Sequence, residues 1–243
     1  MMRLGKEVSW VVAGVFAVAL AGCCDSSTPL GVRESGAGGP AVVVLGTTST
    51  FGVLAGSSVA NTGATTITGD LGVSPGSTVT GFPPGTVSGT IHTNDAAAIA
   101  AQTALTAAFN DVNARTASLI TVAGDLGATT LSPGLYASTS SLALSGTVTL
   151  NALGHSNAIF IIRTASTLTT AAGSHVVLTG GAKASNVIWL VGTSATLGAN
   201  SDFQGIILAD QSVTMNTGAH LVGSALARTG AVTLDTNSIA VAP

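Results

Sequence analysis

The chain has 243 residues, of which 46% are hydrophobic and only 7% are charged, and its formal net charge is −3. Soluble domains ordinarily carry charge on about a quarter of their residues. The lack of a basic surface argues against nucleic acid as a partner, and the scarcity of ionisable side chains leaves few candidates for acid–base chemistry.

The N-terminus has the layout of a secretory signal peptide. Arg3 and Lys6 precede an apolar run at 8–20 that is too short to span a bilayer. The run ends in Leu20-Ala21-Gly22-Cys23, which resembles the lipobox of bacterial lipoproteins. We therefore predict a lipoprotein-type signal peptide over residues 1–22 and lipidation of Cys23, which would anchor an extracytoplasmic protein to a membrane of the cell envelope. The alternative is an ordinary cleaved signal and release from the cell.

Residues 23–44 are rich in Ser, Gly and Pro in their first part, which is typical of a flexible tether. Cys24 is the only other cysteine, so no disulfide or thiolate metal site is expected in the remainder. We predict one folded domain over residues 45–243.

The stretch 94–118 differs from its surroundings because Ala dominates and Gly and Pro are absent. Apolar residues recur at helical spacing, and Asn94 or Thr93 could cap the start, with Asp95 in the first turn. The pattern predicts one long amphipathic helix whose buried stripe comprises Ala98, Ala101, Leu105, Ala108 and Val112.

Threonines recur between apolar residues in the second half of the chain. Alignment of the short β-type segments places five of them in one column: Thr149, Thr169, Thr196, Thr214 and Thr233. Side chains alternate between the two faces of a strand, so the apolar neighbours are expected to point inward and the threonines outward. A repeat of this length favours a β-solenoid in which each coil stacks on the preceding one.

A second type of segment is apolar at every position and occurs at 158–162, 186–191 and 205–209. Such runs indicate burial on both sides. One side would be the solenoid interior, and the predicted helix is the only element available to cover the other. The sequence thus predicts a mostly β protein, a β-solenoid with one helix along one face.

The outward positions of the threonine-bearing strands are small and uncharged, which would make a flat grid of methyl and hydroxyl groups with stiff side chains. Such a surface suits a flat, neutral and periodic partner such as ice, although Thr also simply suits exposed strands. The predicted binding residues are Thr66, Thr68, Thr147, Thr149, Thr167, Thr169, Ser194, Thr196, Ser212, Thr214, Asn216 and Thr233.

Four segments resemble the microbial ice-binding protein family: LGTTSTFGVLAGSSVANTG (45–63), GDLGVSPGSTVTGFPPGTVSGTIH (69–92), SNAIFII (156–162) and GSALARTGAVTLDTN (223–237). The resemblance covers nearly all of 45–241. It implies a discontinuous right-handed β-solenoid whose N-terminal coils pack with the C-terminal ones, and adsorption to ice with thermal hysteresis and recrystallisation inhibition. It also suggests a second strip with a Thr-small-x-Thr pattern, at 62–65 and 164–167.

An enzyme is the first rival hypothesis, because many β-solenoids cleave polysaccharides. The predicted domain has seven Asp and no Glu, and no pair of carboxylates is set up for glycoside hydrolysis. Asp70 and Asp125 occur in GDLG segments and are interpreted as turn residues. His175 and His220 hold similar repeat positions around Asp202, but no third metal ligand is evident. No catalytic residue, metal or other cofactor is expected.

The second rival is a surface adhesin or glycan-binding module without ice activity. Aromatic residues, which usually form sugar platforms, make up only 4% of the chain, and Trp189 lies in a run expected to be buried. The preferred prediction is a monomeric ice-binding protein.

Overall fold

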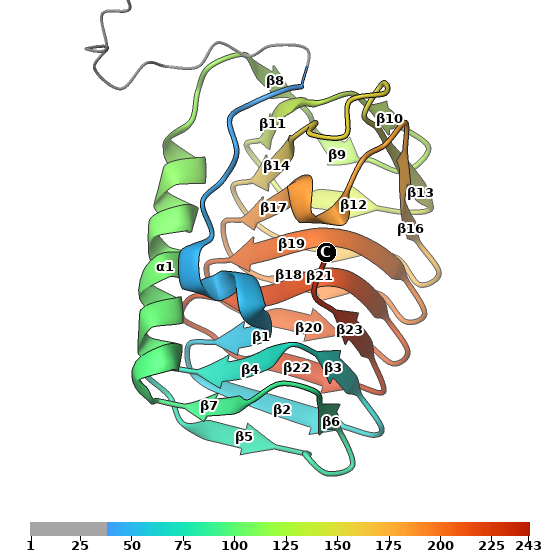
Figure 1. Cartoon of the computed structure of the whole chain (residues 1–243). Coiled ribbons are helices and arrows are strands. Elements are labelled where there is room, and N and C mark those ends of the chain that lie inside the picture. Colours follow the sequence, from blue (N-terminus) through green and yellow to red (C-terminus); the bar gives the residue numbers. More distant parts are fainter. Residues whose placement is uncertain (1–37) are drawn as a thin grey trace, which may run out of the picture. The chain divides into compact units, whose positions relative to one another are not determined.

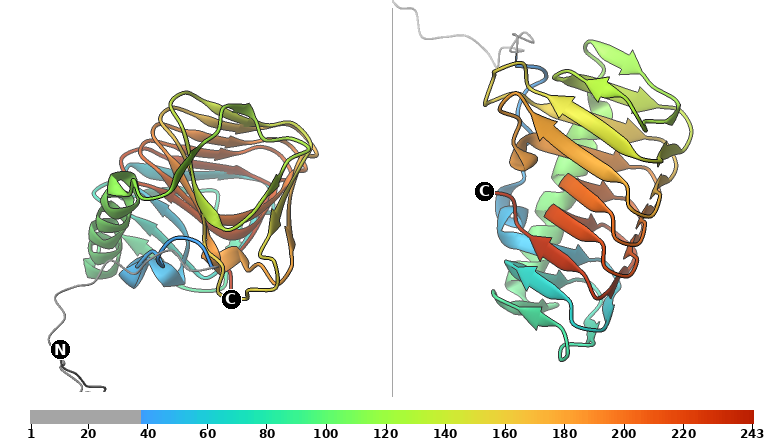
Figure 2. Two further views of the ribbon diagram at one scale, coloured as in Figure 1. Left: turned by 90° about the horizontal axis from the view of Figure 1, so that it is seen from above. Right: turned by 90° about the vertical axis from the view of Figure 1, so that its right-hand side faces the viewer.

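The structure, a computed structural model, describes residues 38–243, and these belong to one compact unit. They form a solenoid of parallel strands with one long helix along its side (Figure 1). Seen along the solenoid axis, each coil has three sides (Figure 2). The predicted mostly β solenoid with a lateral helix is confirmed.

The first side, here named the helix face, is apolar on both of its surfaces. Inward side chains such as Trp189 join the solenoid core, while outward ones such as Ile188 and Leu190 pack in a second cluster with the helix. The predicted doubly buried runs are therefore confirmed. In stacking order the strands are β8 (Leu119–Thr121), β11 (Gly134–Ser138), β14 (Phe160–Thr164), β17 (Val187–Val191), the second halves of β19 (Asp202–Ala209) and β21 (His220–Ala227), β1 (Phe51–Ala55), β4 (Asp70–Val73) and β7 (Ile91–Thr93).

The second side, here named the threonine face, is an eight-stranded sheet. Its strands alternate between buried and accessible residues, as Val213, Thr214 and Met215 do in β20, so one surface packs on the core and the other meets solvent. In stacking order the strands are β9 (Gly124–Asp125), β12 (Leu142–Leu144), β15 (Leu168–Thr170), β18 (Ala195–Leu197), β20 (Val213–Met215), β22 (Val232–Asp235), β2 (Ser58–Thr62) and β5 (Thr78–Thr80).

The third face completes each coil. Its strands are β10 (Thr130–Leu131), β13 (Thr147–Asn151), β16 (His175–Thr179), the first halves of β19 and β21, β23 (Ser238–Ala240), β3 (Thr66–Thr68) and β6 (Thr86–Val87). β19 and β21 continue without a break into the helix face, and they bend at Gly205 and Gly223, whose φ angles are 116° and 151°. A Cβ at Gly223 would lie 1.9 Å from the carbonyl oxygen of Gly205, so the two bends stack only without side chains.

The coils are not stacked in chain order. The N-terminal coil follows the last C-terminal coil, because β1 pairs with β21, β2 with β22 and β3 with β23. The helix α1 (Ala96–Ala114) then returns the chain along the helix face to the opposite end, where β8 begins (Figure 1). This is the packing of N-terminal with C-terminal coils that the family resemblance implied.

The predicted stripe of α1 is buried as expected, together with Phe109. The helix is shorter than the predicted 94–118, and the expected cap was wrong. Asn94 has a left-handed φ of 51°, whereas Asp95 is extended and accepts a hydrogen bond from the Ala98 amide at 2.9 Å. Asp95 is therefore the N-cap. At the other end Arg163 donates to the carbonyl of Asn113 at 2.7 Å, which satisfies a free C-terminal acceptor.

Asp95 also contacts His92 through its second oxygen at 2.7 Å. The Ala98 amide, and to a lesser extent His92, lower the pKa of this carboxyl below its usual 3.8. A group whose pKa is lower in the folded state stabilises the fold above its unfolded pKa, and this contribution is lost as pH falls through the folded pKa. Asp95→Asn keeps a capping side chain but has no titrating charge. We therefore expect the free energy of unfolding of this variant to fall less than that of the parent protein as the pH drops below about 3.8.

Denaturant unfolding of both proteins at about pH 3 and about pH 5 measures this effect. Because Asp125 titrates in the same range, the informative quantity is the difference between the two pH dependences. Identical pH dependences would show that the charge on Asp95 contributes nothing.

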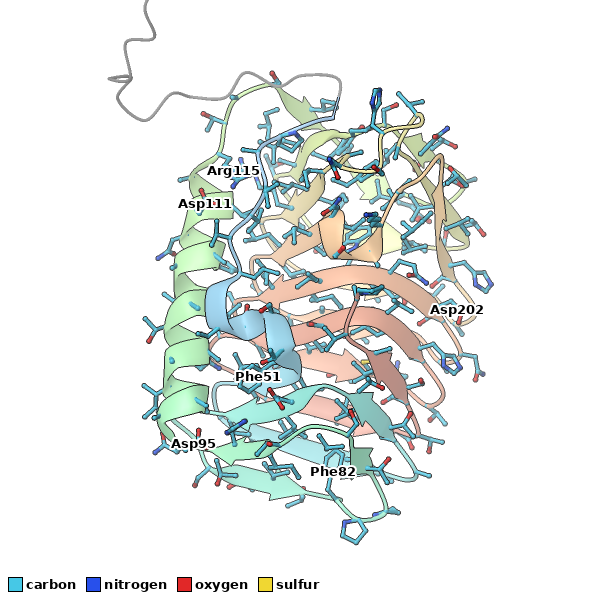
Figure 3. The ribbon with its side chains drawn as sticks, viewed as in Figure 1. Phe51, Phe82, Asp95, Asp111, Arg115 and Asp202 are labelled. Carbon is cyan, nitrogen blue, oxygen red and sulfur yellow. The ribbon has the colours of Figure 1, made fainter. Side chains whose placement is uncertain are left out.

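The chain before β1 packs against the solenoid. Gly38 accepts a hydrogen bond from the Ile159 amide at 2.8 Å, Val43 is buried, and Arg115 donates to Val42 at 3.1 Å and to Ala41. Arg115 and its partner Asp111 lie at the C-terminal end of α1 (Figure 3). A short 3₁₀ helix, η1 (Gly46–Thr50), then leads into β1. The packed chain thus includes residues before the predicted domain start at 45.

The predicted signal peptide at 1–22, the lipidation site Cys23 and the tether as far as residue 37 lie outside the described residues. Within 38–243, no helix is both long and apolar enough to cross a membrane.

Candidate functional site

The outward side chains of the threonine face form columns that run along the solenoid axis. In the central column the backbone pairing places Thr169 beside Thr196, Thr196 beside Thr214, and Thr214 beside Thr233. The column continues to Ala60 and Thr80 at one end and to Ala143 and Asp125 at the other. Four adjacent coils therefore present the same side chain at the same point of the coil.

The hydroxyls of the column nearest the helix face differ from those of the central column. Thr167 donates to Ser141 at 3.0 Å, Ser194 accepts from the Ser212 amide at 3.3 Å, and Ser212 accepts from the Ala231 amide at 3.3 Å. Among the described residues, no side-chain hydrogen bond engages the hydroxyls of the four central threonines. The central column therefore offers free hydroxyls, whereas the neighbouring column uses its own to join the coils.

The third outward column contains the charged edge of the face. Asn216 lies between Gly198 and Asp235 in neighbouring coils, next to the paired residues of β18, β20 and β22. Asp235 accepts hydrogen bonds from Thr217 and, at 3.1 Å, from Thr236. Both carboxylate oxygens of Asp235 are thus hydrogen-bonded within the protein.

Asp125, in the terminal coil, is the other carboxylate of the threonine face. The Ser145 hydroxyl and, less strongly, the amides of Gly127 and Ser145 lower its pKa. The Gly127 bond, at 2.8 Å, confirms the turn role expected for Asp125. The same expectation was wrong for Asp70, which begins strand β4 and accepts from the Thr90 amide of the next coil at 2.9 Å. Among the outward positions of the threonine strands, Asp125 and Asp235 are the only ionisable residues. The middle of the face is therefore uncharged.

The grid is held rigidly from below. Val213, Leu197 and Val232 are fully buried between the outward threonines, and each coil is hydrogen-bonded to the next. Neighbouring strands lie ~4.8 Å apart and alternate residues along a strand ~6.7 Å apart. Because threonine is also restricted at χ1, the positions of its methyl and hydroxyl groups are set before any partner arrives.

The twelve predicted binding residues do not share one face. Thr167, Thr169, Ser194, Thr196, Ser212, Thr214, Asn216 and Thr233 belong to the threonine face, but Thr66, Thr68, Thr147 and Thr149 lie on the third face. The assignment of Thr149 to the central column was therefore wrong. Thr149 pairs with Thr130 and Val177 on the third face. The residue of the same coil that lies in the central column is Ala143, which pairs with Thr169.

The two segments of the second strip suggested by the resemblance do not form one surface, because 62–65 lies at the end of the threonine-face strand β2 whereas 164–167 precedes the threonine-face strand β15. Thr65 is fully buried and accepts a hydrogen bond from the Asn237 amide at 3.0 Å. Thr164 is also buried and donates to the Ser140 carbonyl. Both side chains hydrogen-bond to a neighbouring coil and are too buried to contact ice.

The third face differs from the threonine face in charge and shape. His175, Asp202 and His220 are neighbours in three adjacent strands, and a cavity of about 450 Å³ opens beside them. Among the described residues, no group of three His, Cys, Asp or Glu side chains is placed to hold a metal ion. The sequence shows that these residues recur at similar positions, but the hollow depends on strand pairing that the sequence does not reveal.

Comparison with known proteins adds independent information. Residues 53–240 match the model of the family described as "Ice-binding-like". An ice-binding protein of Nostoc sp. (strain HG1) is 48% identical over 199 residues, which cover 82% of this chain and 74% of the relative. An ice-binding protein of Colwellia sp. is 34% identical over 221 residues, which cover 84% of this chain and 85% of the relative.

Solved structures of ice-binding proteins are similar as well. One from an Antarctic biological consortium has a TM-score of 0.83 and 53% identity, covering 84% of this chain and 92% of its own. One from the Antarctic ascomycete Antarctomyces psychrotrophicus has a TM-score of 0.80 and 40% identity, and the match covers 83% of this chain and 98% of the ascomycete protein.

Proposed function

The chain belongs to the ice-binding-like family, and on this premise we propose that it adsorbs to ice crystals through the threonine face. The observation that carries the proposal is the central column, in which four adjacent coils present threonines with free hydroxyls on an uncharged surface. Adsorbed molecules would stop ice growing between them, which gives thermal hysteresis and inhibition of recrystallisation.

The chemistry of the face suits an ordered water surface. Removal of methyl groups from liquid water is favourable, while the hydroxyls can donate to and accept from an ordered water layer. Because the side chains are already ordered, adsorption loses little conformational entropy. A soluble partner bound by charge would gain nothing from such a face.

The other two faces suit ice less well. On the helix face, α1 covers the outward apolar side chains. On the third face, the strands β19 and β21 bend away and a carboxylate and two imidazoles line a hollow. Of the three sides, the threonine face alone combines a regular, uncharged and uncovered array.

Partitioning into ice tests the proposal as a whole. We expect the protein to be enriched in a slowly grown ice hemisphere, relative to a non-binding protein of similar size that is excluded with the solutes. Exclusion of this chain from the hemisphere would contradict ice adsorption.

We further propose that the protein is a monomer. From the N-terminal sequence we propose that it acts outside the cytoplasm and that lipidation of Cys23 attaches it to a membrane of the cell envelope. Mass spectrometry of the purified protein for a diacylglyceryl group on Cys23 tests the anchor. No catalytic step and no cofactor are part of the proposed function.

A further inference from the structure

The cavity of the third face arises where two strands separate. β16 pairs with β13 over five residues, from His175 to Thr179 in β16, but with β19 only at His175 and Asp202. Beyond that point β19 turns at Gly205 into the helix face, whereas β16 continues along the third face. The result is a groove of about 450 Å³, within the size range of small-molecule sites.

The rim of the groove is polar. Asp202 lies between His175 and His220 in neighbouring strands, which stand ~4.8 Å apart, and its position on the outer side of the solenoid is seen in Figure 3. Nδ1 of His175 lies 2.9 Å from a carboxylate oxygen of Asp202. Because a carboxylate accepts hydrogen bonds, Nδ1 carries the proton, and a neutral His175 presents Nε2 as an acceptor. Gln204 adds an amide group that both donates and accepts.

The walls and the floor of the groove are apolar. Val177, which is 39% exposed, and Val222 line the sides, and the strand residue Phe203 lies beneath. The ring of Phe203 packs 4.9 Å from that of Trp189, and the Trp189 indole N–H donates to the Gln204 carbonyl at 3.0 Å. Beneath the groove, the Gln204 carbonyl is therefore hydrogen-bonded, and the rings of Phe203 and Trp189 are held against each other.

This lining selects among possible ligands. No Lys or Arg lines the groove, so an anion would meet the Asp202 carboxylate without a compensating cation. A purely apolar ligand would leave the polar rim unpaired on burial. A ring that bears hydroxyls at its edge and C–H groups on its face satisfies both parts of the lining.

We propose that the third-face groove binds a neutral oligosaccharide. Its hydroxyls would donate to Asp202 and His175 and accept from Gln204, while a sugar ring lies against Val177 and Val222. A second sugar along the solenoid axis would reach His220, whose ring has no hydrogen-bond partner among the described residues. This activity is separate from ice adsorption and uses none of the outward threonine-face residues.

Nuclear magnetic resonance titration of the isotope-labelled protein above freezing tests the proposal. The probes are maltose, cellobiose and N,N′-diacetylchitobiose, and, in separate samples, ZnCl₂ and an uncharged tetra-alanine peptide. At least one sugar is expected to shift the resonances of His175, His220 and the adjacent backbone with a Kd of about 1 mM or tighter. Asp202→Ala and Gln204→Ala, which remove the carboxylate and the amide that the proposal uses, should each weaken that sugar at least about tenfold.

Thr214→Tyr is the matched control, since it alters the threonine face and should leave sugar binding unchanged. The proposal is overturned if none of the sugars shifts these resonances, if zinc or the peptide shifts them and the sugars do not, or if Gln204→Ala and Asp202→Ala both retain full sugar affinity. Because no ice is present, the result is independent of whether the protein adsorbs to ice.

Discussion

Replacement of Thr214 by tyrosine is expected to abolish most thermal hysteresis while leaving the unfolding transition nearly unchanged. Thr214 lies in the middle of the central column, paired with Thr196 on one side and Thr233 on the other. A tyrosine ring would project beyond the plane of the neighbouring threonines and hold them away from a flat ice surface. The inward neighbours Val213 and Met215 remain in the core, and tyrosine is favourable in strands.

The third face supplies a closely matched control in Thr149. It is half-buried between Val148 and Leu150 in an alternating strand, as Thr214 is between its own apolar neighbours. Thr149→Tyr should keep both its hysteresis and its stability, whereas Thr196→Tyr should behave like Thr214→Tyr. Hysteresis measured by nanolitre osmometry and unfolding followed by circular dichroism separate the two effects. Loss of activity in the Thr149 variant alone would move the ice surface to the third face.

The contrast between these two threonines also shows how far sequence carries the prediction. Alternation of apolar and hydroxyl residues reveals which side chains point out of the solenoid, and it identified β15, β18, β20 and β22 of the threonine face and β3 and β13 of the third face. It does not reveal on which side of a three-sided coil a strand lies. The coil that contains both β12 and β13 has two alternating strands, and the one with a threonine at its centre belongs to the third face.

A long loop did not prevent the correct alignment of Thr169 with Thr196. The two are direct neighbours, as predicted, although the chain between them includes the 3₁₀ helix η2 (Ala184–Asn186) and its flanking loop. The contrast between free and engaged hydroxyls depends on structural detail, since Thr167 and Thr169 look alike in sequence and differ in their partners. Burial on both sides, by comparison, follows from composition alone, which is why the helix face was predicted well.

The helix α1 gives the largest expected effect on stability. Leu105 is fully buried and belongs to the cluster that joins α1 to the outward side chains of the helix face, including Leu54, Leu190 and Leu208. Leu105→Ala should lower the free energy of unfolding by about 2–5 kcal/mol, because it removes buried apolar contact and leaves a cavity. For a domain of this size each kcal/mol corresponds to about 2–4 °C in Tm.

Ile99→Ala on the same helix is the appropriate control, because Ile99 is 50% exposed and alanine favours the helix, so its effect should stay within about 0.5 kcal/mol. At temperatures where both variants are folded, both should partition into ice like the parent protein, since neither residue belongs to the threonine face. If folded Leu105→Ala failed to enter ice, α1 would be needed to keep the threonine face flat. If its Tm equalled that of Ile99→Ala, the packing of Leu105 would contribute little, and the coils would be held together mainly by their own pairing.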